Sequence, residues 1–248
     1  MKTIKTCRIL GVNIAVTNME ETVRYIEENR KELSGKYICV SNVHTTVMSY
    51  EDPQYRKVQN SAALALPDGR PLSIVSRRRG FQEAERVTGP DLMGKLFARD
   101  DGLKHFFYGD KQETLDILRE NLQREYPSIQ IAGMISPPYR KLTEEEKAEH
   151  VKAIRESGAD IIWVGLGAPK QENWMYEHQG MFPGVMIGVG AGFSYHAGLL
   201  KRAPEWMQRM SLEWLYRLMQ DPIRLYKRYF RTNLKFLFLE MKDKGEEV

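Results

Sequence analysis

The residues best suited to do chemistry lie at the end of an apolar segment in the second half of the chain. Residues 161–164 read Ile-Ile-Trp-Val, which predicts a strand buried on both faces, as in parallel sheets. A glycine turn at 165–167 follows, and Pro169 suits the first turn of a helix. Such a turn offers backbone N–H groups to an anion, although an ordinary strand–helix connection is the alternative. The candidate binding residues of this turn are Gly167, Lys170, Gln171 and Glu172.

Polar loops follow several other predicted strands. They are Ser-Asn-Val-His at 41–44, Pro-Asp-Gly at 67–69, Tyr-Gly-Asp at 108–110 and Gly-Val-Gly-Ala-Gly at 188–192. Because ligands of parallel sheets bind at the carboxyl ends of the strands, we expect Asp68 to share one site with the glycine turn. The alternative for Asp68 is a hydrogen bond within its own turn. His44 and His196 are candidate general bases, or else structural residues held by hydrogen bonds.

Several catalytic motifs are missing from the sequence. It contains neither a D-x-D pair for a metal-bound nucleotide nor the H-E-x-x-H and C-x-x-C pairs of zinc sites. The G-x-G-x-x-G of dinucleotide-binding sites and the G-x-x-x-x-G-K-[ST] of P-loop nucleotidases are also missing. Residues 192–196 resemble the nucleophile elbow of serine hydrolases, but His196 replaces its last glycine. These classes are therefore disfavoured.

The elements that must position these loops alternate along the chain. Predicted strands cover 37–41, 62–66, 105–108, 129–132, 161–164 and 185–189. Predicted helices cover 18–32, 42–50, 53–60, 70–79, 90–99, 110–126, 144–158 and 170–179. Caps support two of these helices: Thr17-Asn18 with Glu21, and Thr143 with Glu146. The alternation predicts an α/β fold with a doubly wound, mostly parallel sheet.

Composition is typical of a soluble globular protein. The chain has 248 residues, 42% of them hydrophobic and 28% charged, enough for one large domain or two small ones. No apolar run approaches the ~20 residues of a membrane span, and no secretory signal opens the chain. Its two cysteines, Cys7 and Cys39, favour a reducing compartment. We therefore expect a cytoplasmic location.

The basic charge of the chain is concentrated in its tail. Residues 201–239 contain nine basic and three acidic residues, a net charge of +6, whereas residues 1–200 balance near zero. Two amphipathic helices are predicted, over 205–220 and from Asp221-Pro222 onward. Their aromatic and basic stripes are typical of binding to an anionic membrane surface. A core-packing helix with a solvated basic face, or a nucleic-acid patch, is the alternative. Nucleic acid is disfavoured because no binding motif is present. We expect a core over 1–200 and a basic helical appendage over 201–248.

Six segments of the chain match the motifs of one known family. They are Pro67-Asp68-Gly69, Arg86-Val87-Thr88-Gly89-Pro90-Asp91-Leu92, Tyr108-Gly109, Gly165-Leu166-Gly167-Ala168-Pro169-Lys170-Gln171-Glu172, Lys201-Arg202-Ala203-Pro204-Glu205-Trp206 and Leu212-Glu213-Trp214-Leu215-Tyr216-Arg217-Leu218. Together they resemble the WecG/TagA/CpsF glycosyltransferases, glycosyltransferase family 26. The resemblance extends from near the N-terminus to about Arg231. The combination of motifs is more specific than any single spacing.

This resemblance implies a bacterial enzyme at the inner face of the cell membrane. Such enzymes move a sugar from a UDP-sugar to an undecaprenyl-diphosphate-linked sugar, with inversion and without a metal or other cofactor. The best-known members transfer N-acetylmannosamine to linked N-acetylglucosamine (GlcNAc), for teichoic acid, enterobacterial common antigen or capsule. The implied fold is a Rossmann-like core with a C-terminal helical appendage that docks on the membrane and closes over the site. The resemblance also suggests self-association.

The resemblance assigns roles to individual residues. It implies that Asp68 is the base that takes the proton from the acceptor hydroxyl. Asn42 and Gln171 are expected to orient sugar hydroxyls, and Arg86 to contact donor or acceptor. The remaining binding candidates are Tyr108, Gly167, Lys170, Glu172, Arg217, Arg224 and Arg228. The three arginines of the appendage are expected to stabilise the charge of the leaving UDP.

The sequence departs from the family pattern near the expected sugar pocket. Val40 stands where many members carry Thr, and the segment Val43-His44-Thr45 differs from the teichoic-acid members. N-acetylmannosamine is therefore the default donor sugar, with glucose or another hexose as the alternative. Two other functions are weighed against the transferase. One is a non-catalytic UDP-sugar-binding protein of the membrane surface, and the other is an NAD-dependent oxidoreductase.

Overall fold

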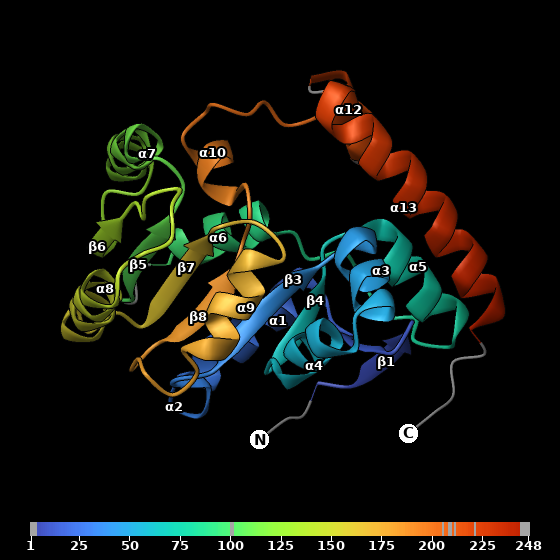
Figure 1. Ribbon diagram of the computed structural model, residues 1–248, viewed down its shortest axis with the longest axis horizontal. Coiled ribbons are helices and arrows are strands. Elements are labelled where there is room, and N and C mark those ends of the chain that lie inside the picture. The colour runs from blue at the N-terminus through green and yellow to red at the C-terminus, as the bar shows by residue number, and fades with distance from the viewer. Residues whose placement is uncertain are drawn as a thin grey trace.

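A single twisted sheet forms the centre of the molecule (Figure 1). The computed structural model describes residues 4–99, 102–204, 206–207, 210, 212–220 and 222–243, without the side chains of 223–230. Its eight strands lie in the order β1-β2-β4-β3-β8-β7-β5-β6. The β1–β2 pair is antiparallel and the other pairings are parallel. This confirms the mostly parallel α/β sheet.

The six strands expected from the sequence are all present. The strands are β1 (Thr6–Ile9), β2 (Val12–Ala15), β3 (Tyr37–Ser41), β4 (Leu64–Pro67), β5 (Lys104–Gly109), β6 (Gln130–Ile135), β7 (Ile161–Gly165) and β8 (Val185–Gly188). The hairpin of β1 and β2 was missed. Its two-residue turn, Leu10 and Gly11, has positive φ at both positions, 48° and 84°. Leucine is not a residue that signals such a turn, so the sequence pattern did not reveal it.

Helices connect the strands as the alternation predicted. They are α1 (Met19–Glu28), α2 (Arg30–Leu33), α3 (Val43–Glu51), α4 (Pro53–Ser61), α5 (Arg70–Arg78), α6 (Gly89–Phe97), α7 (Gln112–Glu125), α8 (Glu144–Glu156), α9 (Lys170–Glu177), α10 (Gly192–His196), α12 (Glu213–Gln220) and α13 (Pro222–Lys242). Asn18 caps α1 through the N–H of Glu21, and Thr143 with Glu146 forms the capping box of α8.

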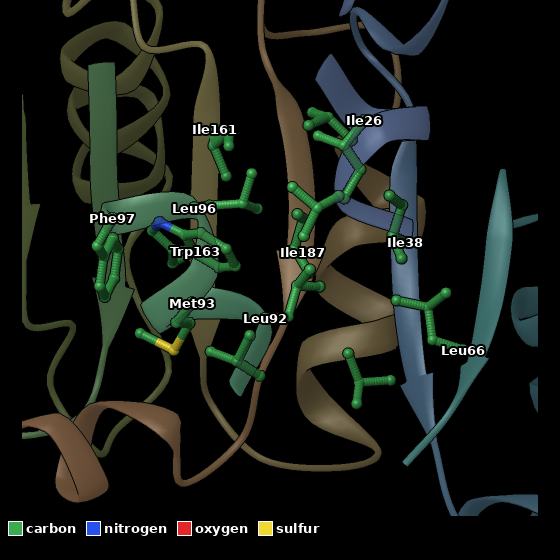
Figure 2. Packing of buried hydrophobic residues seen from close by; sticks show 14 of the residues in the cluster. Ile26, Ile38, Leu66, Leu92, Met93, Leu96, Phe97, Ile161, Trp163 and Ile187 are labelled. Carbon is green, nitrogen blue, oxygen red and sulfur yellow. The ribbon is translucent and has the colours of Figure 1, made fainter. Parts of the chain in front are cut away.

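Both faces of the sheet are covered by helices, because successive strand residues point to opposite sides. On one face, strand residues such as Ile38, Trp163 and Ile187 pack against α1 and α6 (Figure 2). On the other, Cys39, Ile162 and neighbouring residues pack against α3, α5, α8 and α9. The carboxyl ends of β3, β4, β7 and β8 therefore meet at one edge of a well-packed core.

Helix α13 lies beside α3 and α5, and α12 joins its first turn (Figure 1). The continuous helix expected over 205–220 is wrong: Met210 lies in a turn, and the carbonyl of Leu212 starts α12 by accepting from the N–H of Tyr216. Residues 205, 208, 209 and 211 are outside the described part of the chain. Phe236 of α13 is buried in the core cluster on the α3 and α5 face. The end of the appendage is thus packed against the core.

Candidate active site

Asp68 lies at the end of β4, where the next strand in the sheet also ends. Its backbone N–H donates to the carbonyl of Ser41, at the end of β3, over 2.8 Å. Asn42 follows Ser41 and caps α3: its side-chain oxygen accepts from the N–H groups of His44 and Thr45 at 3.0 and 3.3 Å. The Asn42 side chain also lies close enough to the Asp68 carboxyl to lower its pKa. The structure therefore brings together two of the residues expected to bind substrate and accept a proton.

Asp68 is only partly exposed, and charged side chains surround its carboxyl. Taken together, its surroundings raise its pKa to about 6: burial is the dominant cause, and the carboxylate of Glu213 also acts to raise it. Three neighbours lower this pKa: the guanidinium groups of Arg217 and Arg86, and the Asn42 side chain. Such a carboxyl is mostly ionised at neutral pH and is more basic than an ordinary aspartate. This is the property that a general base requires.

Helix α12 reaches this carboxyl from the appendage. Glu213 accepts a hydrogen bond from Arg86 over 2.6 Å, and Arg202 lies 3.9 Å from the other oxygen of the same carboxylate. Arg202 in turn pairs with Asp91, which also accepts from the hydroxyl of Thr88. Glu213 belongs to a family motif, but the sequence did not mark it as a site residue. Its position between Arg86 and Arg202 results from the fold.

Arg217, one turn further along α12, lies over the ring of Tyr195, 5.7 Å from its centroid. Tyr195 belongs to α10, which follows the glycine-rich end of β8. Arg217, Tyr195 and Asp68 influence one another electrostatically, so the appendage, α10 and β4 converge at one site. The side chains of Arg224 and Arg228, also expected here, lie outside the described part of the chain.

The glycine turn after β7 is closed by a side chain of its own helix. The side-chain oxygen of Gln171 accepts from the N–H of Gly167 at 3.2 Å and from the N–H of Gly190 at 3.0 Å. Both glycines have positive φ, 75° and 55°, which other residues rarely adopt. The N–H of Gly167 is therefore already paired within the protein, and a substrate contact of Gly167 stays a prediction. Gln171, 4% exposed, joins the ends of β7 and β8.

Glu172 lies beneath the turn rather than at its rim. It is 1% exposed, and one carboxyl oxygen accepts from the amide of Gln171 over 2.8 Å. Its other oxygen is buried with no hydrogen-bond partner among the residues described. Burial raises the pKa of Glu172, and the nearby Tyr55 hydroxyl offsets part of that rise. Burial therefore favours the protonated form of Glu172 more than it is favoured in an exposed glutamate.

A chain of buried hydrogen bonds begins at Tyr55, near Glu172, and ends at β3. The hydroxyl of Tyr55 accepts from the amide of Gln59 over 3.0 Å, and Gln59 accepts from Ser41 over 2.6 Å. Since Ser41 precedes Asn42, this chain leads from the surroundings of Glu172 to the β3 end of the site. Gln59 and Tyr55, which the sequence patterns did not single out, thus support the site from below.

The remaining candidates lie at varying distances from this centre. Lys170 is exposed at the start of α9. Tyr108 is 2% exposed and stacks on Trp174, 4.4 Å between centroids, in the wall of a cavity of about 610 Å³ between α8 and α9. A substrate contact of Tyr108 stays a prediction. His196 hydrogen bonds the carbonyl of Pro90 over 2.9 Å, the structural role considered for it.

Two kinds of feature, a metal-binding cluster and a membrane-spanning helix, are not found among the described residues. No group of three or more His, Cys, Asp or Glu side chains in this part of the chain is arranged to hold a metal ion. None of its helices is both long and apolar enough to cross a bilayer.

Comparison with known proteins gives a consistent answer. The model of the family described as "Glycosyl transferase WecG/TagA/CpsF family" matches residues 7–247, appendage included. A relative from Bacillus spizizenii (strain ATCC 23059 / NRRL B-14472 / W23) is 34% identical, over 84% of this chain and 78% of the relative. Relatives from Bacillus subtilis (strain 168) and Staphylococcus aureus (strain MW2) are 31% and 30% identical, over 89% and 86% of this chain and 86% and 84% of theirs. Each of the three is named N-acetylglucosaminyldiphosphoundecaprenol N-acetyl-beta-D-mannosaminyltransferase.

Proposed function

Because this chain belongs to the WecG/TagA/CpsF family of glycosyltransferases, we propose that it transfers N-acetylmannosamine from a UDP-sugar to undecaprenyl-diphosphate-linked GlcNAc. The names of its relatives support this donor sugar and this acceptor. The polymer that we propose it serves is a cell-wall polysaccharide such as teichoic acid. Family membership disfavours both the non-catalytic binding protein and the NAD-dependent oxidoreductase.

The observation that carries the proposal is the setting of Asp68. Its pKa of about 6 leaves the carboxylate ionised at neutral pH, and so able to accept the proton of the acceptor hydroxyl. As that oxygen bonds to the anomeric carbon from the face opposite UDP, the bond to the UDP oxygen breaks. This single displacement inverts the anomeric centre, and the proton remains on Asp68.

The leaving diphosphate needs positive charge in the absence of a metal. Of the three appendage arginines proposed for this role, Arg217 is the one whose side chain the structure describes. It lies close enough to Asp68 to lower the pKa of that carboxyl. Since the N–H of Gly167 is occupied by Gln171, we place the donor diphosphate against the outer side of the turn, near the exposed Lys170. Arg224 and Arg228 remain proposed partners of the same diphosphate.

The appendage is proposed to hold the enzyme on the inner face of the cell membrane. Large apolar side chains of the appendage are exposed, among them Trp206 at 58%, Met210 at 64% and Met219 at 70%. The same region carries the concentrated basic charge. Apolar insertion and attraction to anionic lipid together give stable but reversible binding. Self-association stays a prediction.

The test is UDP release from a panel of UDP-sugars, with a short-chain prenyl-diphosphate-GlcNAc acceptor and EDTA present. Acceptor-dependent release from UDP-N-acetylmannosamine is expected. Release from another UDP-sugar instead would identify that sugar as the donor. Loss of UDP release on adding EDTA would contradict a metal-independent reaction. No acceptor-dependent release from any UDP-sugar would contradict the proposed transfer.

A further inference from the structure

A second polar cavity adjoins the base on the side of α5. It has a volume of about 320 Å³ and is lined by Arg70, Ser73, Arg77, Glu85 and Arg86. Three arginines against one glutamate give its lining a net positive charge. At about 30 Å³ for each water molecule, the cavity has room for roughly ten waters, so it is large enough for a polar ligand group.

Two of these arginines lack a partner in the part of the chain that the structure describes. Arg86 pairs with Glu213, but the guanidinium groups of Arg70 and Arg77 make no hydrogen bond or ion pair with any residue that the structure describes. Both side chains are only partly exposed. Residues 70, 73 and 77 recur on one side of α5, so the helix presents them to the same space. Unpaired, converging guanidinium groups are suited to bind phosphate oxygens.

The order of the strands separates this cavity from the donor side. Asp68 directly follows β4, and the next strands in the sheet are β3, β8 and β7. Strands β7 and β8 end at the two glycine turns that Gln171 joins. Helix α5 begins directly after the Asp68 loop. Asp68 therefore lies between the glycine turns and the arginine cavity. In a displacement with inversion, the attacking hydroxyl and the leaving diphosphate occupy opposite sides of the anomeric carbon.

We propose that Arg70 and Arg77 bind the diphosphate of the lipid-linked acceptor, a role that rests on the proposed transferase function. With that diphosphate in the cavity, the acceptor sugar extends toward Asp68, because Arg70 begins α5 two residues after Asp68. The prenyl chain leaves beside α12, because Arg86, in the cavity wall, pairs with Glu213 of that helix. Trp214 follows Glu213 and is 43% exposed, and it offers the chain an apolar surface.

The decisive variants are Arg70→Gln and Arg77→Gln, with Arg78→Gln as the matched control. Arg78 is an exposed neighbour on α5 that does not line the cavity. We expect each cavity variant to raise the KM for a short-chain prenyl-diphosphate-GlcNAc acceptor about 10-fold or more, as for loss of a charged hydrogen bond. The KM for the UDP-sugar and the values for Arg78→Gln should change less than about 2-fold. Assays without vesicles exclude an effect through membrane lipid.

A binding measurement separates this inference from the proposed reaction. Titration with a short-chain prenyl diphosphate that lacks the sugar should show binding to the unmodified protein that is about 10-fold weaker in Arg77→Gln. If the unmodified protein binds this probe through Arg77 but never releases UDP, the site stands and the transfer is wrong. An unchanged acceptor KM and unchanged probe binding in both cavity variants would overturn the assignment. A rise in the UDP-sugar KM alone would assign the cavity to the donor instead.

Discussion

Arg86 of the core and Glu213 of helix α12 lie 2.6 Å apart, so the appendage is joined to the core within the active site itself. The same carboxylate raises the pKa of Asp68, while Arg217, four residues further along α12, lowers it. Helix α12 therefore places one negatively and one positively charged side chain near the candidate catalytic carboxyl. The appendage is part of the site as well as a candidate membrane anchor.

Replacing Asp68 by Asn should separate activity from stability. The change removes the proposed base and is expected to lower kcat by at least ~10²-fold. Because burial raises the folded pKa above the unfolded value, the ionised carboxyl costs stability at neutral pH. With allowance for its partial exposure, Asp68→Asn should raise the free energy of unfolding by about 1–2 kcal/mol at pH 8. Thermal unfolding and steady-state rates check both effects, and near-normal turnover would remove Asp68 from the mechanism.

The pH dependence of kcat/KM should follow the charges around Asp68. Activity is expected to rise with pH, with a midpoint at about 6, because only the ionised carboxyl accepts a proton. Glu213→Gln removes a charge that raises this pKa and should move the midpoint to lower pH, whereas Arg217→Gln should move it higher. Glu120→Gln, an exposed change on α7, is the control. Identical profiles in all four proteins would contradict the assignment.

Glu172 should tolerate an amide but not an apolar side chain. Glu172→Gln keeps an acceptor for Gln171 and stays neutral, so activity should change less than about 2-fold. Glu172→Leu leaves the Gln171 amide unpaired, at a cost of about 1–3 kcal/mol, and loosens the turns at Gly167 and Gly190. We expect the KM for the UDP-sugar to rise in this variant. Equal KM values for the two variants would show that the buried chain does not position the turn.

The same pair of variants predicts a pH effect on stability. The pKa of Glu172 is raised in the folded protein, so its contribution to stability is fully present below the unfolded pKa and is lost as pH rises. The Tm of the unmodified protein should therefore fall with rising pH more steeply than the Tm of Glu172→Gln. Parallel plots of Tm against pH from pH 5 to pH 9 would contradict the raised pKa of Glu172.

The end of the appendage should contribute to the stability of the core. Phe236 is 3% exposed, whereas Phe238, two residues on, is 52% exposed. Phe236→Ala is expected to cost about 3 kcal/mol and to lower Tm by roughly 6–12 °C. Phe238→Ala should leave Tm nearly unchanged. Equal Tm values for the two variants would show that α13 does not pack as described.

Truncation after Arg202 is consequently expected to do two things. It removes Glu213 and Arg217 from the site, so activity on a lipid acceptor should be largely lost. It also removes Asp243, which accepts from the N–H of Leu10 at 2.8 Å, and so should lower the stability of the soluble core. Full activity after truncation would refute the role of the appendage.

Exposed apolar residues of α13 should govern membrane binding without affecting the fold. Leu234 and Leu237 are 53% and 58% exposed. Replacing both by Ser should weaken binding to vesicles containing anionic lipid by about 10-fold or more, since each loses apolar burial in the membrane. Tm should not fall. Sedimentation with the vesicles measures this, and unchanged binding would place the membrane contact elsewhere.

The sequence alone determined the α/β alternation, because apolar strand segments and helix caps are local signals. It placed the six strands from β3 to β8 and two capped helix starts, and the family motifs identified the enzyme class. Those motifs also singled out Asp68, Arg86 and Gln171. The N-terminal hairpin escaped notice, because Leu10 is an unusual residue for its turn.

Only the tertiary structure decided how these residues are used. Gln171 looked free to bind substrate until the fold brought Gly190 within 3.0 Å of its oxygen. Glu213 became part of the site because α12 folds back onto Arg86, 127 residues earlier in the chain. The raised pKa of Asp68 likewise comes from burial and from charges on separate segments. Such contacts depend on packing between distant parts of the chain, which no local pattern encodes.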